Sequence, residues 1–376
     1  MSYEIPTPTF VLDMVRLRAN LETAQRIRKG AGCKILLATK AFALPAVFPF
    51  MRDYLDGTTA SGEQEARLGA EQFGKEVHVY SPAYAPDEVE RLSEIAQHIY
   101  FNSAKQLDQY GAQAKAAGAQ IGLRVNPAYS NATLGGDLYD PCAPKSRFGE
   151  VTDRLDAVLW DQVDIFHVHA LCESGSDGSV GLIEHVADRF APYLNHVQTV
   201  NFGGGHFINK DGYDVDAVIT AIRNFRDQFD VEVILEPGSG LVVDTGELIA
   251  SVVDLHWNEV DIALLDASAS THMPDVLEVP YRPDIIGAAA ADEFPYTYRL
   301  AGRTCMTGDI IGDYSFPAPL KEGDRVIFTD QMHYTFVKTN TFNGNPLANL
   351  AVRHETGEIE LLSDFGYDAF RHRLGR

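Results

Sequence analysis

The 376-residue chain contains little cysteine, and what it has is not arranged for cross-linking. Its four cysteines are Cys33, Cys142, Cys172 and Cys305. They lie far apart, without the close spacing of a zinc cluster or the paired spacing of a disulfide framework. We therefore expect reduced thiols.

Long apolar runs and positive charge are also scarce. No apolar run approaches the length of a membrane span, and residues 1–6 have neither the basic start nor the apolar middle of a signal peptide. The chain carries 31 lysines and arginines against 53 acidic residues, a formal charge of -22. This balance disfavours nucleic acid and anionic membranes as partners, and it is compatible with a small cationic substrate. We expect a soluble, cytoplasmic protein.

A regular alternation of short β-rich runs and amphipathic stretches fills the first 245 residues. The runs predicted as strands are 34–39, 54–59, 77–81, 98–102, 121–126, 164–170, 196–202 and 231–236. Helices are expected between them, for example over 86–96, 103–117 and 214–229. Eight strands that alternate with helices are typical of a (β/α)8 TIM barrel, an α/β fold.

The pattern changes after about residue 245. Further strands are predicted over 248–255, 262–266, 298–301, 325–329, 335–338 and 347–353, with Pro and Gly turns and no long helices between them. We therefore predict a barrel domain over 13–245 and a mostly β domain over 246–376. The extended segment 1–12 is expected to join the second domain.

Lys40 follows the first predicted strand, where an unpaired charge would be costly. A desolvated amine has a lowered pKa and becomes nucleophilic, so Lys40 is a candidate covalent anchor for a carbonyl cofactor. The ordinary alternative is a lysine that extends its ammonium to solvent from a strand end. Its neighbours on the catalytic face of the barrel must decide between these interpretations.

Other polar residues end the predicted strands at the same face. They include Ser61, Arg124, Asn126, His169, Gly203, Gly204, Gly205 and Glu236. If pyridoxal 5'-phosphate binds there, His169 would stack on its ring and Glu236 would keep the ring nitrogen protonated. Gly203–Gly205 would let backbone amides approach the phosphate, and Arg124 would orient Glu236 or other acidic groups.

A metal site is a competing interpretation of the same face. His167 and His169 alternate on one predicted strand, so both side chains point the same way and could bind a metal ion. The carboxylates that would complete a zinc site are not evident in the sequence, and we predict no metal. The glycine run is equally compatible with a flexible turn.

The motifs resemble those of the fold type III pyridoxal-phosphate decarboxylases, the group of diaminopimelate and ornithine decarboxylases. The matching segments are 36–41, 166–169, 201–205, 236–238, 305–309, 334–335 and 342–344. The resemblance implies an alanine racemase-like barrel with a C-terminal β domain. It also implies a homodimer with shared active sites, in which Lys40 and Cys305 are catalytic and Tyr334 contacts the cofactor.

Within this group the chain is similar to the carboxynorspermidine (carboxyspermidine) decarboxylases, over 169–173, 201–206, 269–275 and 333–344. That similarity implies decarboxylation of carboxynorspermidine, carboxyspermidine or both in polyamine biosynthesis, with a cationic polyamine-type substrate. The residues implied to receive its amines are Asp309, Asp275, His272 and Glu173.

Two departures from related motifs bear on the substrate. Diaminopimelate decarboxylases usually carry an arginine after Glu-Pro-Gly, whereas this chain has Ser239, which favours a substrate with a distal amine. Carboxynorspermidine decarboxylases usually have Glu-Ala there, and this chain has Ser239 and Gly240. A diaminopimelate or other basic amino-acid decarboxylase, and an amino-acid racemase of the same fold, remain alternatives.

Overall fold

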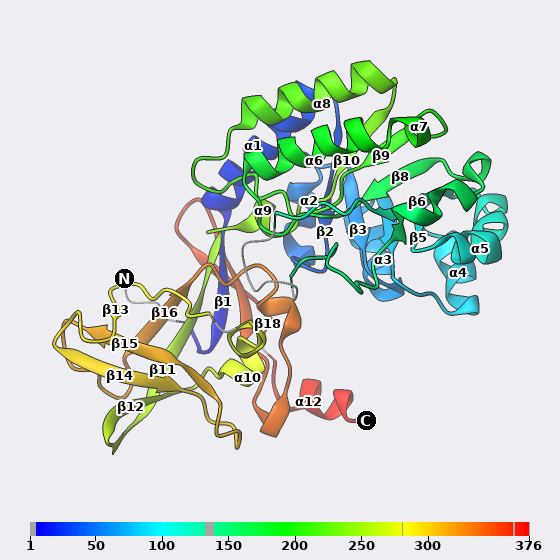
Figure 1. Ribbon diagram of the computed structural model, residues 1–376. Helices are drawn as coiled ribbons and strands as arrows, with labels where there is room; N and C mark the ends of the chain where they lie inside the picture. Colours follow the sequence, from blue (N-terminus) through cyan, green and yellow to red (C-terminus); the bar gives the residue numbers. More distant parts are fainter. Residues whose placement is uncertain (1–4, 132–138, 280, 364, 376) are drawn as a thin grey trace. The chain divides into compact units, whose positions relative to one another are not determined.

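The computed structural model describes residues 5–131, 139–279, 281–363 and 365–375. The chain divides into two compact units, Ala19–Leu241 and Met1–Arg18 with Val242–Arg376 (Figure 1). The boundaries expected from the sequence, after residues 12 and 245, lie close to these limits. Each unit is described by itself below.

The first unit is built on a closed barrel of parallel strands. Its strands are β2 (Lys34–Ala38), β3 (Gly57–Ala60), β4 (Glu76–Tyr80), β5 (His98–Phe101), β6 (Gln120–Asn126), β8 (Ile165–Val168), β9 (Thr199–Asn201) and β10 (Glu232–Leu235). They pair in the order β5-β4-β3-β2-β10-β9-β8-β6, and pairing of β5 with β6 closes the ring. A short strand, β7 (Glu150–Val151), extends the sheet beside β6. Each strand overlaps one of the eight predicted runs, so the TIM barrel prediction is confirmed.

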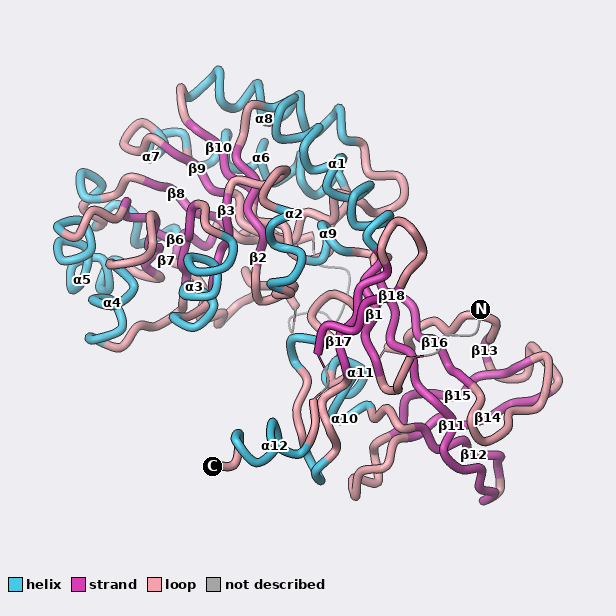
Figure 2. Tube along the Cα trace, turned by 180° about the vertical axis from the view of Figure 1, so that it is seen from behind, coloured by secondary structure: helices cyan, strands magenta, loops and turns pink. Residues whose placement is uncertain are grey.

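Helices cover the outside of the barrel strands (Figure 2). They are α1 (Met14–Ala31), α2 (Phe48–Met51), α3 (Glu63–Leu68), α4 (Pro86–Ser93), α5 (Ala104–Ala116), α6 (Ser176–Arg189), α7 (Ala191–Leu194) and α8 (Val215–Phe229). Side-chain caps start three of them: Asp13 accepts from the Val15 and Arg16 amides, Ser103 from the Gln106 amide and Asp214 from the Ala217 amide. Among the residues that the structure describes, no helix is long and apolar enough to cross a bilayer.

The barrel interior is partly polar because β4 and β5 carry polar residues at alternate positions. His78 pairs in register with His98, and Tyr80 with Tyr100. Alternate residues of a strand point to one face, so these side chains gather on one side of the sheet. Space for the buried Tyr100 ring depends on Gly122 of β6, where an added Cβ would lie 2.1 Å from that ring. The barrel is therefore built around this polar cluster.

The second unit is a mixed sheet, so the predicted β domain is confirmed. Its strands are β1 (Thr9–Asp13), β11 (Gly246–Asn258), β12 (Val260–Leu265), β13 (Ala289–Ala290), β14 (Tyr296–Ala301), β15 (Ile310–Phe316), β16 (Arg325–Thr329), β17 (Asn349–Arg353) and β18 (Ile359–Ser363). They run in the order β13-β15-β14-β12-β11-β1-β17-β18, and β16 pairs with β11. The N-terminal strand β1 lies between β11 and β17. The short helices of this unit are α10 (Ala269–His272), α11 (Asp275–Glu278) and α12 (Tyr367–Arg373), while α9 (Ser239–Val242) spans the boundary between the two units.

One predicted strand is wrong. Residues 335–338 form a 3-10 helix, Phe336–Lys338, because Thr335 has helical angles (φ -51°, ψ -57°) and the Lys338 amide donates to the Tyr334 carbonyl. The ammonium of Lys338 forms ion pairs with Asp275 and Glu278 of α11. These tertiary contacts outweigh the β propensity of a short Thr-Phe-Val run.

Candidate active site

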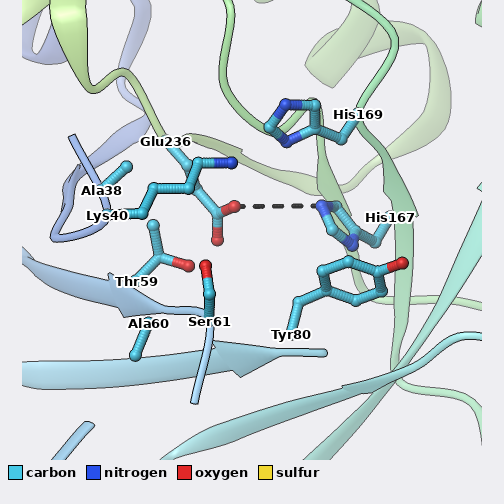
Figure 3. A pocket seen from close by; sticks show the side chains of 9 residues that line it. All are labelled: Ala38, Lys40, Thr59, Ala60, Ser61, Tyr80, His167, His169 and Glu236. Carbon is cyan, nitrogen blue, oxygen red and sulfur yellow. Dashed lines mark ion pairs between the residues drawn. The ribbon is translucent and has the colours of Figure 1, made fainter. Parts of the chain in front are cut away.

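A pocket opens at the C-terminal ends of the barrel strands (Figure 3). It is lined by Ala38, Lys40, Thr59, Ala60, Ser61, Tyr80, His167, His169 and Glu236. Lys40 follows β2, His169 directly follows β8, and Glu236 directly follows β10. Figure 3 shows the Lys40 amine, the Glu236 carboxylate and both imidazole rings directed toward one another. The structure thus brings together four residues that the sequence singled out at separate strand ends, Lys40, Ser61, His169 and Glu236.

Lys40 has the environment of a reactive amine. The Lys40 side chain as a whole is partly exposed. The protein around its amine lowers the pKa of Lys40 from the ordinary value, chiefly through burial and secondarily through the nearby Arg124. A lowered pKa leaves more of the amine uncharged at neutral pH, and the uncharged amine is the nucleophile. Lys40 can therefore form a covalent bond to a carbonyl carbon.

Glu236 is a buried carboxylate that stays ionised. Its Oε1 accepts a hydrogen bond of 2.8 Å from Asn201 Nδ2 and lies 3.8 Å from His78 Nδ1, and its Oε2 lies 3.8 Å from His167 Nε2. Burial would raise the pKa of Glu236, but the contacts with His78, His167 and Asn201 outweigh it and lower the pKa to about 2. At 3.8 Å the two imidazole contacts are electrostatic, so the Asn201 amide is the direct hydrogen-bond donor.

His169 is held by the glycine run that follows β9. The Gly204 amide donates to His169 Nδ1 over 3.2 Å, and an added Cβ at Gly203 would lie 2.7 Å from the Cβ of His169. Burial lowers the pKa of His169 well below its usual range, with Lys40 as the next cause, so the ring is neutral. The Gly203 amide also donates within the chain, to Asn201 Oδ1. Close packing is thus the role of Gly203 and Gly204 visible in the structure, and phosphate binding by Gly203–Gly205 stays a proposal.

Arg124 does not orient Glu236 as the sequence suggested. Its Nη2 donates to the carbonyl of His169 over 3.0 Å, and its guanidinium lies 4.5 Å from the ring centre of Tyr80 and 4.6 Å from that of Phe148. Burial lowers the pKa of this guanidinium. The aromatic rings compensate for part of its lost hydration. Arg124 therefore positions the backbone of His169.

The unpaired ring nitrogens of His167 indicate whether a polar ligand fits the pocket. Its ring is buried, yet neither ring nitrogen has a hydrogen-bond partner among the described residues. Buried polar atoms are nearly always paired, so the pocket is suited to a polar occupant. Together with a nucleophilic amine, an ionised carboxylate and a neutral imidazole, this donor set fits pyridoxal phosphate.

The metal alternative gains Glu236 as a third potential ligand beside the two histidines. Potential ligand atoms of His167, His169 and Glu236 lie within 4.8 Å of one another. Burial lowers the pKa of His167 to about 3, so both rings are neutral and could accept a metal. The similarities to known proteins reported below favour the pyridoxal cofactor for this pocket.

In the sheet unit, Cys305 lies on an exposed loop between β14 and β15. Its backbone amide donates to Asn343 Oδ1 over 2.7 Å, and Asn343 itself has a positive φ of 56°. The side-chain amide of Asn343 thus fixes the loop backbone while the thiol stays accessible. This accessibility fits a residue that reacts with a bound substrate.

Asp309 and His272 are buried and hydrogen-bonded within the sheet unit, and their substrate-binding role stays a prediction. The buried Asp309 carboxylate accepts hydrogen bonds from the hydroxyls of Ser268 and Thr304 and from the amides of Ser270 and Thr304. His272 is fully buried: Nδ1 accepts from the Ser268 amide, so Nε2 carries the hydrogen and donates to the Pro346 carbonyl. Asp309 thus holds Thr304, the residue before Cys305, against Ser268 and Ser270, while His272 connects Ser268 to Pro346.

The other residues predicted to contact the substrate or the cofactor differ in their surroundings. Asp275 is already paired with Lys338, which leaves it less available to a substrate amine. Tyr334 has a positive φ of 50°, an unusual backbone conformation for a bulky residue that is often found at functional sites. Glu173 is exposed after β8 and also has a positive φ, of 44°. Of the amine ligands implied by the resemblance, Glu173 retains an accessible carboxylate.

Several residues behind Glu236 escaped the sequence interpretation. They are Glu76, His78, Tyr80, His98, Tyr100 and Asn201. A signal was present, since polar residues alternate on two successive predicted strands at i, i+2 and i+4, a pattern that places them on one face. Because buried parallel strands are usually apolar throughout, this alternation marks a functional interior.

The chain is similar to known proteins in its family, its sequence and its structure. A family model for the pyridoxal-dependent decarboxylase, C-terminal sheet domain, matches residues 10–331. The carboxyaminopropylagmatine decarboxylase of Synechocystis sp. is 42% identical over 373 residues, which cover 99% of this chain and 96% of that protein. The carboxynorspermidine/carboxyspermidine decarboxylase of Campylobacter jejuni is 38% identical over 385 residues, which cover 99% of this chain and 100% of that protein.

A solved structure extends the similarity to three dimensions. The crystal structure of carboxynorspermidine decarboxylase complexed with norspermidine, from Campylobacter jejuni, superimposes with a TM-score of 0.90 at 36% identity. The match covers 98% of this chain and 100% of that one. The similarity therefore includes both units.

Proposed function

The chain belongs to the family of pyridoxal-dependent decarboxylases with a C-terminal sheet domain, and from this premise we propose that it decarboxylates carboxynorspermidine, carboxyspermidine or both. The family, the enzyme class and the pyridoxal cofactor predicted from the motifs are confirmed. The observation that supports this substrate class is the full-length similarity to an enzyme whose crystal structure contains norspermidine. The proposed role lies in polyamine biosynthesis, and a family of decarboxylases favours CO2 release over the racemase alternative.

Within this proposal the barrel pocket holds the cofactor. Pyridoxal phosphate, when bound, supplies an electron sink for the electron pair left on the α-carbon as CO2 leaves. When the cofactor is bound, Lys40 would hold it covalently through its amine, the neutral ring of His169 would face its pyridine ring, and Glu236 would keep the ring nitrogen protonated. Because Glu236 stays ionised even in its buried position, it favours the charged pyridine ring that accepts electrons best.

We propose that Cys305 donates the proton that replaces the carboxyl group. The thiol S–H bond breaks, the proton goes to the α-carbon, and the electron pair stays on sulfur as thiolate. Its exposure on the sheet unit supports this assignment. We further propose a cytoplasmic homodimer in which Cys305 of one subunit serves the barrel pocket of the other, with Tyr334 near the cofactor.

The cationic arms of the substrate need acceptors. Glu173 is the best placed of the proposed ligands because its carboxylate is exposed beside the loop that follows β8. Asp275 would have to exchange its ion pair with Lys338 for one with the substrate. Charge-assisted hydrogen bonds of this kind are typical of amine recognition.

Carboxyaminopropylagmatine is the second candidate substrate, favoured by the 42% identity to an enzyme named for it. It ends in a guanidinium where carboxynorspermidine ends in an amine, and both ends are cationic at neutral pH. A carboxylate can bind a guanidinium through two parallel hydrogen bonds, whereas it binds an ammonium as a point charge. The choice therefore depends on the geometry of the acceptor for the distal end.

A panel assay for CO2 release tests the proposal. The purified, cofactor-loaded protein is offered carboxynorspermidine, carboxyspermidine, carboxyaminopropylagmatine, diaminopimelate, ornithine and lysine at equal concentrations. We expect the highest kcat/KM for carboxynorspermidine or carboxyspermidine. A clear preference for carboxyaminopropylagmatine would select the second candidate, and activity confined to diaminopimelate would overturn both.

A further inference from the structure

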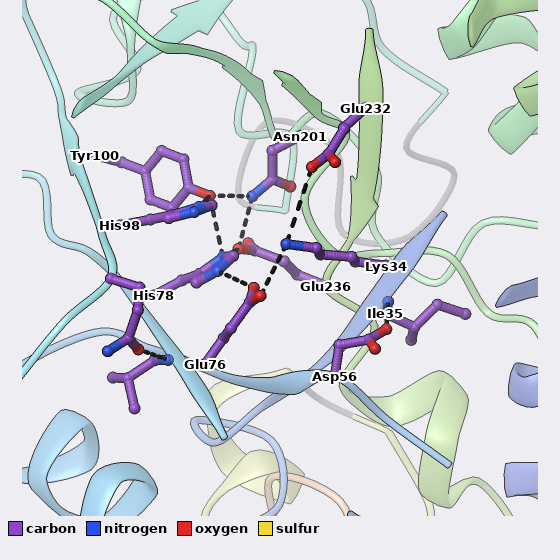
Figure 4. A network of polar contacts seen from close by, with 12 residues as sticks. Lys34, Ile35, Asp56, Glu76, His78, His98, Tyr100, Asn201, Glu232 and Glu236 are labelled. Atoms are coloured by element: carbon purple, nitrogen blue, oxygen red, sulfur yellow. Dashed lines mark hydrogen bonds and ion pairs between the residues drawn. The ribbon is translucent and has the colours of Figure 1, made fainter. Parts of the chain in front are cut away.

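A continuous chain of polar contacts runs through the barrel interior to Glu236 (Figure 4). It starts at the base of β2, where Lys34 Nζ lies 2.8 Å from Glu76 Oε1. The other oxygen of Glu76 lies 3.3 Å from His78 Nε2. On its far side, His78 Nδ1 lies 3.2 Å from the Tyr100 hydroxyl and 3.8 Å from Glu236 Oε1. The cofactor pocket is thus connected to the opposite end of the barrel.

His78 is the centre of this chain because each of its ring nitrogens faces a carboxylate. Nε2 faces Glu76 and Nδ1 faces Glu236, and the side chain is fully buried. A carboxylate can only accept hydrogen bonds, so whichever nitrogen carries the hydrogen has an acceptor in front of it. The side chain has no accessible surface, so bulk solvent does not screen these contacts. The ring therefore influences the position and charge of both carboxylates.

The hydrogen bonds around Glu236 fix the orientation of the Asn201 amide and the contacts of the Tyr100 hydroxyl. Asn201 Oδ1 accepts from the Gly203 amide, so the Asn201 NH2 group must face the other way. Its two hydrogens go to the Tyr100 hydroxyl and to Glu236 Oε1, each over 2.8 Å. Tyr100 accepts this hydrogen bond and also contacts the Nδ1 atoms of His78 and His98. Asn201 and His78 thus act on the same carboxylate oxygen from two strands.

Several charged and titratable groups surround His78. They are Lys34 on β2, Glu76 on β4, His98 and Tyr100 on β5, His167 on β8 and Glu236 after β10. Burial lowers the pKa of His98 and of His167 to about 3, so both rings are neutral near pH 7. His78 is the one imidazole of the described cluster that lies between two carboxylates.

We propose that His78 is a positioning residue, which holds the Glu236 carboxylate in place and ionised for the ring nitrogen of the cofactor. This inference rests on the proposed role of Glu236 in cofactor binding. His78 touches neither the substrate nor the cofactor in this account, and it acts through the carboxylate alone. A residue placed behind a functional group can fix the orientation and charge of that group, here through the 3.8 Å electrostatic contact between His78 Nδ1 and Glu236 Oε1.

A metal ion is the rival explanation for the same cluster. Potential ligand atoms of Glu76, His78 and His98 lie within 4.8 Å of one another. However, the Lys34 ammonium already pairs with Glu76, and the Tyr100 hydroxyl already contacts both Nδ1 atoms. A cation would have to displace these contacts beside an existing positive charge. The hydrogen-bonded chain is therefore the better account.

Three variants separate positioning from simple packing. His78→Leu removes both ring nitrogens at similar volume, and His78→Gln keeps an amide donor that can reach a carboxylate. His98→Leu is the matched control, because its ring stacks on His78 with centroids 3.8 Å apart but contacts Tyr100 in place of Glu236. The control removes an equally buried histidine from the same cluster. Both leucine variants should lose stability to a similar degree.

The decisive readout is the visible absorption spectrum of the bound cofactor as a function of pH, recorded without substrate. We expect His78→Leu to bind the cofactor and to shift the pH at which its spectrum changes, while His98→Leu follows the wild type. With substrate, kcat of His78→Leu should fall by roughly 10- to 100-fold, as for outer partners in metal sites, with KM changed far less. His78→Gln should recover part of both effects.

The inference is overturned if His78→Leu and His98→Leu share one spectral pH profile and one kcat, because His78 would then only fill space. Stoichiometric metal that remains on the wild type and is lost from His78→Gln would overturn it in favour of the metal. If His78→Leu does not fold, the same comparison can be made between His78→Gln and His98→Gln. The spectrum needs no substrate, so an error in the proposed substrate would leave this test intact.

Discussion

Asn201 donates a hydrogen bond of 2.8 Å from Nδ2 to Oε1 of Glu236, and this contact fixes a buried carboxylate at the end of β10. The same side chain accepts the Gly203 amide through Oδ1. One amide thus ties the glycine run that holds His169 to the carboxylate proposed to hold the ring nitrogen. Two parts of the cofactor site are positioned together because they share this residue.

Loss of the Lys40 amine should abolish covalent attachment of the cofactor. Lys40→Ala is expected to lack the visible absorption band of the bound cofactor and to release no measurable CO2, because no other amine lines the pocket among the described residues. Lys34→Ala is the control, since this lysine lies at the opposite end of β2 and pairs with Glu76. A Lys40→Ala protein that keeps the band would remove Lys40 from its role.

Removal of the charge of Glu236 should reduce the rate while leaving the cofactor bound. Glu236→Gln preserves the shape of the side chain and one acceptor oxygen for Asn201, but it carries no charge that could favour a protonated ring nitrogen. We expect kcat to fall by roughly 100-fold or more, within the range for groups that control protonation. Glu232→Gln, on the exposed start of β10, is the matched control. Equal kcat values for the two variants would refute the role of Glu236.

Cys305→Ala should keep the cofactor and lose control of protonation. The variant is expected to show the wild-type visible spectrum, a lower kcat and an abnormal product beside the polyamine, because the proposed proton donor is gone. Mass spectrometry of the products measures this. Cys142→Ala, a cysteine of the barrel unit, should behave as wild type. A fully normal product from Cys305→Ala would assign the proton to another group.

Asp309 should matter for stability rather than for substrate affinity. Its carboxylate accepts hydrogen bonds from Ser268, Ser270 and Thr304, so Asp309→Ala leaves buried donors unpaired. The cost is roughly 2 to 4 kcal/mol, for a buried charged acceptor with several donors. Thermal unfolding should show a lowered Tm. An unchanged Tm with a raised KM would instead restore the direct substrate contact expected from the sequence.

Acid should destabilise the barrel before its carboxylates titrate. Burial lowers the pKa of His98 and of His167 from 6.5 to about 3. As the pH falls below 6.5, the unfolded chain binds protons that the folded chain excludes, so stability decreases down to about pH 3. Between pH 6.5 and 5 the loss is roughly 2 kcal/mol for each ring. Glu236, with its pKa lowered from 4.5 to about 2, extends the loss to lower pH.

Urea unfolding at pH 7.5, 6.5 and 5 measures this dependence. The free energy of unfolding should depend less on pH in His98→Gln. One of the two buried imidazole rings is gone in this variant, and Gln does not ionise. Stability that stays constant between pH 6.5 and 5 would contradict the assignment of buried neutral imidazoles. Stability that rises in this range would require the opposite sign of pKa shift.

The barrel could be predicted from the sequence because its strands repeat at regular spacing and local signals mark each one. Lys40, His169 and Glu236 could be placed together for the same reason, since parallel strands present their C-terminal ends on one face. The first β strand, Thr9–Asp13, could only be expected to join the sheet. Its partners, β11 and β17, are hundreds of residues away, and pairing over such distances leaves no local pattern.

The roles of Asp309 and His272 could not be derived from the sequence. A carboxylate in a Gly-Asp turn and a histidine before Met-Pro look the same whether exposed or buried. Whether each side chain is exposed or buried depends on hydrogen-bond donors that the fold brings near it, such as Ser268, which contacts both residues. Residues 335–338 illustrate the same limit, because an ion pair from Lys338 to α11 favours a helical turn over a strand.

The most direct test of the account is competition between carboxynorspermidine and diaminopimelate in one reaction. Both substrates are supplied to the cofactor-loaded protein at equal concentration, and the products are identified by mass. Because the cationic arm is the feature that distinguishes the two, the account predicts norspermidine as the dominant product, with little lysine. Lysine as the main product would contradict it.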